Sequence, residues 1–119
     1  MDRELELKLI EEVKKDPFKL KDIEEQTEDI CLAAIKSAGS AVILRVKNQT
    51  EKICLEAVKQ NGNALQYVKN QTKEICLAAI LQDAYFMNHV KHQTEDLYLE
   101  AAKINGNVLE CFRFFNLIK

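Results

Sequence analysis

The side chains best suited to chemistry in this sequence are cysteines that recur at a fixed interval. Cys31, Cys54 and Cys76 follow one another at spacings of 23 and 22 residues. Thiolates that hold zinc lie in clusters, often two residues apart, with a fourth ligand nearby. Thiols one repeat apart would lie on the order of 10 Å apart, and the next equivalent position is Tyr98. We therefore interpret these cysteines as small core residues and predict no metal and no other cofactor.

The two histidines form the second arrangement that could bind a ligand. His89 and His92 are three residues apart, so both could lie on one face of a helix. The sequence fixes no third ligand beside them, and the preceding repeat has Tyr67 and Asn70 at these positions. No paired carboxylates, nucleophile motif or phosphate-binding loop is visible. We predict no catalytic residues and a protein that is not an enzyme.

The cysteines belong to a longer repeated unit. The pair Gln-Thr begins at Gln26, Gln49, Gln71 and Gln93, and identities recur along the whole unit, which reads QTEKICLEAVKQNGNALQYVKN over residues 49–70. A fixed period of this length is typical of stacked repeat proteins. We predict an all-α fold, an α-solenoid of stacked short helical hairpins with a repeat period of 22–23 residues.

We expect one repeat domain over residues 1–119. Asp16-Pro17 has the pattern of an N-cap followed by proline at the first helical position. The charged residues before it would form the polar end that a solenoid needs for solubility. The predicted parts are an N-terminal cap or half repeat (1–25), four repeats (26–48, 49–70, 71–92 and 93–114) and a C-terminal end (115–119).

Within each repeat we predict two helices. A threonine N-cap precedes the first helix, and acidic residues follow it (Thr27, Thr50, Thr72 and Thr94). Three glycines stand where a left-handed residue would end that helix (Gly39, Gly62 and Gly106). The third repeat has Asp83-Ala84 at this place, so we expect a different turn there. The second helix should then continue to the next Gln-Thr pair.

The segment from Gln49 to Thr72 closely resembles a repeat family known as domain of unknown function 4116. The shared register is QTEEICLxAVKQNGxALQYVKNQT, and a looser likeness extends over residues 16–114. The family recurs in giant DNA viruses of amoebae and in some bacteria and protists that live with such hosts. The resemblance implies helical repeats and an intracellular, viral setting. It implies no activity, because the family has none established.

Composition and charge exclude several partners. A formal net charge of −2 creates no field that would attract nucleic acid or an anionic membrane. No apolar run approaches the roughly 20 residues that span a bilayer, and the first residues lack the pattern of a signal peptide. We therefore expect an intracellular protein, in the host cytoplasm if it is viral, with its four cysteines reduced.

Apolar residues at positions where other repeats are polar indicate a surface for a protein partner. In the third repeat these are Leu81 and Tyr85, and Phe86 adds apolar bulk beside them. The C-terminal end adds a cluster with few charges (Phe112, Phe114, Phe115, Leu117 and Ile118). These residues could also fold back and seal the last repeat. Because exposed apolar patches usually mark association, we predict a protein-interaction module, including a homodimer through the C-terminal end.

Basic residues one repeat apart form a ladder (Lys47, Lys69, Lys91 and Arg113). Such a row could follow a phosphate backbone, which makes a nucleic-acid-associated protein the alternative function. Each member, however, falls in the last turn of a predicted second helix, where a cation offsets the helix dipole. The electrostatic interpretation is favoured, and nucleic acid is the weaker alternative.

Overall fold

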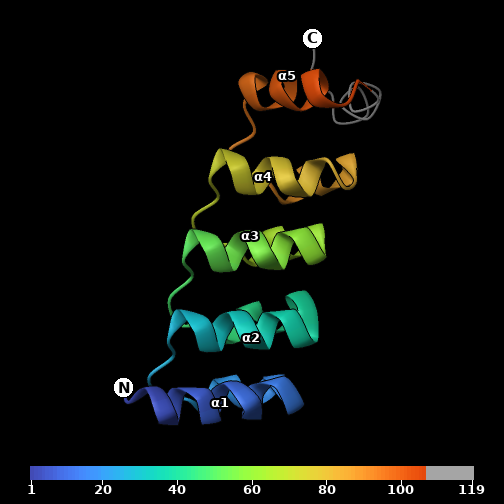
Figure 1. Ribbon diagram of the computed structural model, residues 1–119. Coiled ribbons are helices and arrows are strands. Elements are labelled where there is room, and N and C mark those ends of the chain that lie inside the picture. Colours follow the sequence, from blue (N-terminus) through green and yellow to red (C-terminus); the bar gives the residue numbers. More distant parts are fainter. Residues whose placement is uncertain (107–119) are drawn as a thin grey trace.

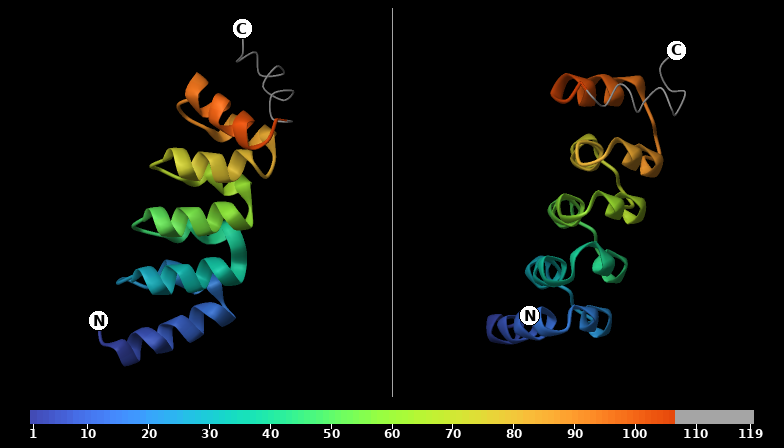
Figure 2. Two further views of the ribbon diagram at one scale, coloured as in Figure 1. Left: turned by 45° about the horizontal axis from the view of Figure 1, so that its top comes forward. Right: turned by 90° about the vertical axis from the view of Figure 1, so that its right-hand side faces the viewer.

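The repeats stack in single file, and each repeat described over its full length contributes one helix to each of two layers. The computed structural model describes residues 1–106, and the molecule measures 55 × 20 × 20 Å along its principal axes. The α-helices lie one above another (Figure 1), and shorter 3-10 helices form a second column beside them (Figure 2, right). Each α-helix contacts the next one in the file. This arrangement confirms the predicted all-α solenoid.

The α-helices are α1 (Arg3–Lys15), α2 (Glu28–Ala38), α3 (Glu51–Gln60), α4 (Lys73–Ile80) and α5 (Glu95–Ile104), and the 3-10 helices are η1 (Pro17–Asp22), η2 (Gly39–Arg45), η3 (Gly62–Tyr67) and η4 (Ala84–His89). Over residues 1–106, none of these helices is both long enough and apolar enough to traverse a bilayer.

The helices α2 to α5 begin as the sequence predicts, at a threonine cap. Thr50 accepts a hydrogen bond from the backbone N–H of Ile53 at 3.3 Å, and Thr27, Thr72 and Thr94 make the same bond in their repeats. Acidic residues occupy the first turn of each of these helices. They stabilise the positive end of the helix dipole.

The second helices within residues 1–106 differ from the prediction in type and length. They are 3-10 helices, and η3 ends at Tyr67, four residues before the next Gln-Thr pair. Three of the buried residues of this region, Gly62, Leu65 and Val68, are spaced by three, and Ala64 is also buried. Three residues make one turn of a 3-10 helix, so this spacing places all three on the core side. The link to the next repeat then begins with Val68 in an extended conformation, where ψ is 121°.

The predicted left-handed glycines are correct at one position only. Gly39 has a φ of 72° and ends α2. Gly62 and Gly106 do not adopt a positive φ, so that part of the prediction is wrong. At Gly62 the constraint is space, because a Cβ there would lie 2.5 Å from Cδ2 of Phe86.

The turn at Asp83-Ala84 was expected to differ, and the structure corrects this too. Asp83 has a φ of −159° and accepts a hydrogen bond from the N–H of Tyr85 at 2.9 Å. Asn61 in the preceding repeat has a φ of −155° and caps η3 in the same way. Because no left-handed residue is needed, alanine at 84 replaces the glycine without strain.

The core runs along the interface between the two layers. On α3 the stripe predicted from the sequence is buried, with Ile53, Cys54, Ala57 and Val58 at most 2 % exposed. Burial of a large aliphatic side chain of this kind stabilises a fold by about 1.5–3 kcal/mol. The alanines equivalent to Ala57 are fully buried in every repeat (Ala34, Ala79 and Ala101). Their small size allows the close approach of neighbouring helices.

Candidate functional site

The glutamine of the Gln-Thr pair connects two neighbouring 3-10 helices. Gln71 donates from Nε2 to the carbonyl oxygen of Leu65 in η3 at 3.0 Å and to that of His89 in η4 at 2.8 Å. Its Oε1 accepts from the backbone N–H of Lys91 at 2.8 Å. One side chain therefore satisfies three backbone groups where each 3-10 helix ends. We call this arrangement the glutamine bridge.

Glutamines equivalent to Gln71 bond to backbone groups at other junctions between repeats within residues 1–106. Gln26 bonds to Leu20 in η1, to Arg45 in η2 and to Lys47, which makes the full bridge. Gln49 bonds to Tyr67 and Lys69 on the η3 side. The sequence marks these glutamines by their recurrence, but it does not show that the partners of Gln26 and Gln71 lie in two different repeats. The bridges are therefore a structural feature, and they account for the strict position of Gln in each unit.

The repeated cysteines lie beside these glutamines. The thiol of Cys31 donates to Oε1 of Gln26 at 3.6 Å, and in the fourth repeat the hydroxyl of Tyr98 donates to Oε1 of Gln93 at 2.9 Å. Tyrosine therefore preserves the donor that the cysteine supplies. The three described cysteines are buried and free, as interpreted from the sequence. Within residues 1–106, no three His, Cys, Asp or Glu side chains converge on a point where they could hold a metal ion.

Burial raises the pKa of the Cys31 thiol from 9.0 to about 11, and Glu28 adds to this shift. Burial also raises the pKa of Cys54 and Cys76. Since the thiolate is the nucleophile, we expect all three thiols to react slowly with a disulfide reagent at about pH 8 and quickly once denaturant unfolds the chain. A Cys111→Ser background leaves only these three thiols. Fast reaction in the native state would contradict the placement.

The same shift predicts a loss of stability in alkali. The folded state favours the protonated thiol, so this contribution is complete below the unfolded-state pKa near 9.0 and disappears as the pH rises through about 11. Thermal unfolding measured across this range should show a smaller decline for Cys31→Ala than for the parent chain.

Threonine hydroxyls link successive α-helices along their N-terminal edge. Thr50 donates to Oε2 of Glu28 at 2.7 Å, and Thr72 donates to Oε1 of Glu51 at 3.1 Å. Each threonine therefore caps its own helix and also bonds to an acid on the helix before it. We call this row of contacts the threonine-acid ladder.

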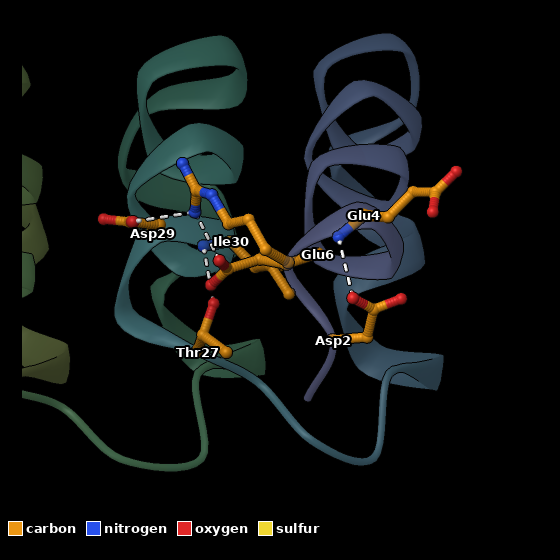
Figure 3. A network of polar contacts seen from close by, with 7 residues as sticks. Asp2, Glu4, Glu6, Thr27, Asp29 and Ile30 are labelled. Atoms are coloured by element: carbon orange, nitrogen blue, oxygen red, sulfur yellow. Dashed lines mark hydrogen bonds and ion pairs between the residues drawn. The ribbon is translucent and has the colours of Figure 1, made fainter.

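The threonine-acid ladder begins at the N-terminal helix. Glu6 on α1 accepts a hydrogen bond from the hydroxyl of Thr27, and Arg3 bonds to Glu6 and lies 3.5 Å from Asp29 (Figure 3). These contacts lower the pKa of Glu6, with the bond from Thr27 as the largest cause and Arg3 next. Although α1 lacks the Gln-Thr pair, it docks on α2 by the same chemistry.

The ladder changes between the third and fourth repeats. Lys73 occupies the position of the acids Glu28 and Glu51, and its Nζ lies 3.2 Å from Oε2 of Glu100 on α5. A cavity of about 310 Å³ lies between α4 and α5, with Lys73, Cys76 and Thr94 among its lining residues. The interface between α4 and α5 is therefore less closely packed on this side.

The predicted apolar residues of the third repeat differ in their exposure. Tyr85 is 55 % exposed, and Leu81 is half-buried just after α4. Phe86 turns inward, where its ring occupies the space left by Gly62 and stacks on His89 with centroids 6.1 Å apart. The C-terminal members lie outside the described residues (Phe112, Phe114, Phe115, Leu117 and Ile118). Packing within the solenoid therefore accounts for Phe86.

The basic ladder was predicted to lie on the second helices, and this part of the prediction is wrong. Lys47, Lys69 and Lys91 follow the ends of the 3-10 helices, in the links between repeats. The ammonium of Lys47 donates to the carbonyl oxygen of Glu24 at 2.9 Å, and that of Lys91 donates to the carbonyl oxygen of Val68 at 3.2 Å. These two lysines thus bind backbone carbonyls of the preceding link. Arg113 lies outside the described residues.

His89 and His92 have different neighbours in the structure. Nε2 of His89 lies 2.9 Å from Oδ1 of Asn63 in the preceding repeat. His92 lies in the next link and lines the cavity between α4 and α5. The two rings therefore do not share a ligand position.

A surface that the sequence analysis did not identify lies on the α-helices alone. A groove of about 450 Å³ crosses α1, α2 and α3, and its lining includes the apolar residues Ile10, Leu32 and Ala33 and the charged residues Asp29 and Lys36. A second groove of about 370 Å³ crosses α3 and α4 (Leu55, Glu56, Lys59 and Glu74). We call this surface, on the side of α1 to α5 away from the 3-10 helices, the α face.

The position of the α face follows from the parallel stacking of the α-helices. On α2, Asp29, Ala33 and Lys36 are spaced by four and three, so they share one side of the helix. The corresponding positions lie in the same place on the following helices, because the repeats lie in one file (Figure 1). Their residues differ, with Lys52, Glu56 and Lys59 on α3. The sequence explains the acids and lysines separately as responses to the helix dipole. Only the stacking brings these positions into rows along the α face.

Comparison with known proteins supports the repeat assignment. A family described as "Domain of unknown function (DUF4116)" matches residues 50–94, which span two repeats from Thr50 to Thr94. This match confirms the resemblance to that family. Comparisons with curated proteins and with solved structures each found no match.

Proposed function

We propose that this chain, whose residues 50–94 match the DUF4116 family, is a non-enzymatic protein-interaction module that binds its partner along the α face. The observation that carries the proposal is the pair of grooves that crosses α1 to α4, with apolar side chains between charged ones. Solenoids present extended surfaces of this kind to their partners. The molecule's 55 Å length allows one partner to contact several repeats.

The described nucleophiles support a non-enzymatic role. Cys31, Cys54 and Cys76 are each at most 3 % exposed, and burial raises the pKa of each thiol. A catalytic thiol instead needs access to substrate and a lowered pKa. The intracellular setting that we propose, the host cytoplasm if the gene is viral, would keep these thiols reduced.

The charges of the α face favour a protein over a nucleic acid. The grooves are lined by both signs of charge, namely the cations Arg3, Lys14, Lys36, Lys52 and Lys59 and the carboxylates Asp29, Glu51, Glu56 and Glu74. A phosphate backbone would be repelled by these carboxylates, whereas a protein can present both signs of charge. The basic ladder adds little to the nucleic-acid alternative, because two of its lysines already bind backbone carbonyls.

A photo-crosslinking experiment tests the proposal in cells that express the protein. Benzoylphenylalanine in place of Glu56, which lines both grooves, should give a covalent adduct with another protein chain. The matched control carries it in place of Gln66, which is exposed on η3 in the other layer. Adducts in equal yield from both positions, or none from position 56, would refute binding at the α face. Crosslinks from position 56 to RNA or DNA would support the nucleic-acid alternative.

A further inference from the structure

We infer that the α face binds a second copy of this chain, so that two solenoids lie face to face with their long axes parallel. The inference rests on the proposed function and names the partner. It is argued from the distribution of charge over the α face and from the area that the face offers.

Opposite charges gather at the two ends of the parallel helices. The first two residues of α2 to α5 comprise six carboxylates and two lysines (Glu28, Asp29, Glu51, Lys52, Lys73, Glu74, Glu95 and Asp96). The last four residues of the same helices contain three lysines and no carboxylate (Lys36, Lys59 and Lys103). Over α2 to α5 the α face therefore has a mainly acidic edge and a basic edge, with leucine between them at Leu32, Leu55, Leu77 and Leu99.

A symmetric dimer can place these edges in two ways. A two-fold axis along the length of the solenoid reverses the direction of the helices, so each acidic edge meets the basic edge of the other copy. A two-fold axis along the α-helices brings acidic edge against acidic edge and basic edge against basic edge. Like charges at close range oppose association. Charge therefore selects the first axis, in which the solenoids are parallel.

The helix dipoles favour the same arrangement. Within one copy all the α-helices of the file run in the same direction (Figure 1), so their dipoles do not cancel. In the parallel dimer, the helices of the second copy run the opposite way across the interface. Each helix N-terminus then approaches a helix C-terminus, which lowers the electrostatic energy of both layers.

The α face is large enough for a stable dimer. A face of 55 by 20 Å offers roughly 1,000 Å² per copy, against the about 800 Å² per partner that a standard interface buries. Its leucines become more exposed toward α5, from 7 % at Leu32 to 48 % at Leu99. An isologous interface would place each leucine opposite the same residue of the second copy.

Charge reversal tests the pairing of the edges. Lys36→Glu combined with Lys59→Glu changes the basic edge, and Asp29→Lys combined with Glu74→Lys changes the acidic edge; all four side chains are exposed. Sedimentation equilibrium should show a wild-type dimer, and self-association of either double variant should be about tenfold weaker or worse. An equimolar mixture of the two variants should recover the dimer, because every contact again joins opposite charges.

Crosslinking then distinguishes the two axes. In a Cys111→Ser background, Leu55→Cys and Leu77→Cys should each form a disulfide with the same residue of the second copy. With antiparallel solenoids, at most one of these positions can lie on the axis, so at most one would crosslink to itself. That result, or a dimer unaffected by either charge reversal, would overturn the inference. A wild-type chain that stays monomeric would also overturn it, yet the proposed function would stand if position 56 still crosslinks to a different protein.

Discussion

Replacing Gln71 by alanine should lower the free energy of unfolding by about 2–3 kcal/mol. The substitution removes hydrogen bonds to Leu65, His89 and Lys91, and each such bond contributes on the order of 1 kcal/mol. The loss is larger than for a local contact, because the three backbone groups belong to two repeats that the side chain holds together. Chemical denaturation monitored by circular dichroism provides the measurement.

Gln66→Ala is the matched control for this substitution. Gln66 is exposed and donates only to the carbonyl oxygen of Asn63 within its own repeat. We expect its replacement to change the free energy of unfolding by less than about 0.5 kcal/mol. If the two alanine variants are equally stable, the glutamine bridge does not hold the repeats together.

Gln71→Glu adds a test that separates hydrogen bonding from packing. The carboxylate would face the carbonyl oxygens of Leu65 and His89, which accept hydrogen bonds from the glutamine amide. Repulsion between these oxygens should raise the pKa of the new carboxyl group in the folded state. The variant should then be most stable below the unfolded pKa of about 4.3 and lose stability as the pH rises through the folded value. Gln71→Ala should lack this dependence.

The features that the sequence predicted correctly depend on interactions between residues of a single helix. Thr50 caps α3 as expected because the bond joins residues three apart. Ile53, Cys54 and Ala57 are buried as their spacing predicts. Such features depend on one helix, so one repeat of sequence is enough to identify them.

Features that depend on two repeats were missed or mistaken. The glutamine bridge at Gln71 joins η3 to η4, and no spacing within one unit indicates that. The second helix was expected to reach the Gln-Thr pair, yet η3 stops at Tyr67. Backbone bonds such as that from Val68 to the carbonyl of Leu65 close the 3-10 turn. The link then extends so that its backbone can meet the glutamine.

For the candidate site, too, the sequence analysis missed what depends on several repeats. Tyr85 and Phe86 were selected because the other repeats have different residues at these positions. The ring of Phe86, however, fills the space beside Gly62. The α face was missed because Lys36, Ala33 and Asp29 are ordinary residues in one helix. Their alignment over several repeats is what distinguishes the surface. A departure from the repeat pattern therefore indicates packing as readily as binding.

Gly62→Ala should destabilise the protein by about 1–3 kcal/mol, the typical cost of overpacking a filled core. An added Cβ would lie 2.5 Å from Cδ2 and 2.7 Å from Cε2 of Phe86, and 3.1 Å from Oε1 of Gln82. The backbone itself would accept alanine, because Gly62 has no positive φ and Ala84 occupies the same place in the next repeat. The loss should therefore come from the aromatic ring.

A double-mutant cycle isolates that contact. In a Phe86→Ala background the ring is absent, so Gly62→Ala should be neutral or stabilise by about 0.4–1 kcal/mol through the reduced freedom of the unfolded chain. Gly106→Ala is the control, since a Cβ there meets no atom within 4 Å. If Gly62→Ala destabilises both backgrounds equally, the bond from the N–H of Gly62 to Gln82 imposes the constraint instead. The expected coupling would mean that a glycine in one repeat fixes the size of the residue that follows 24 positions later.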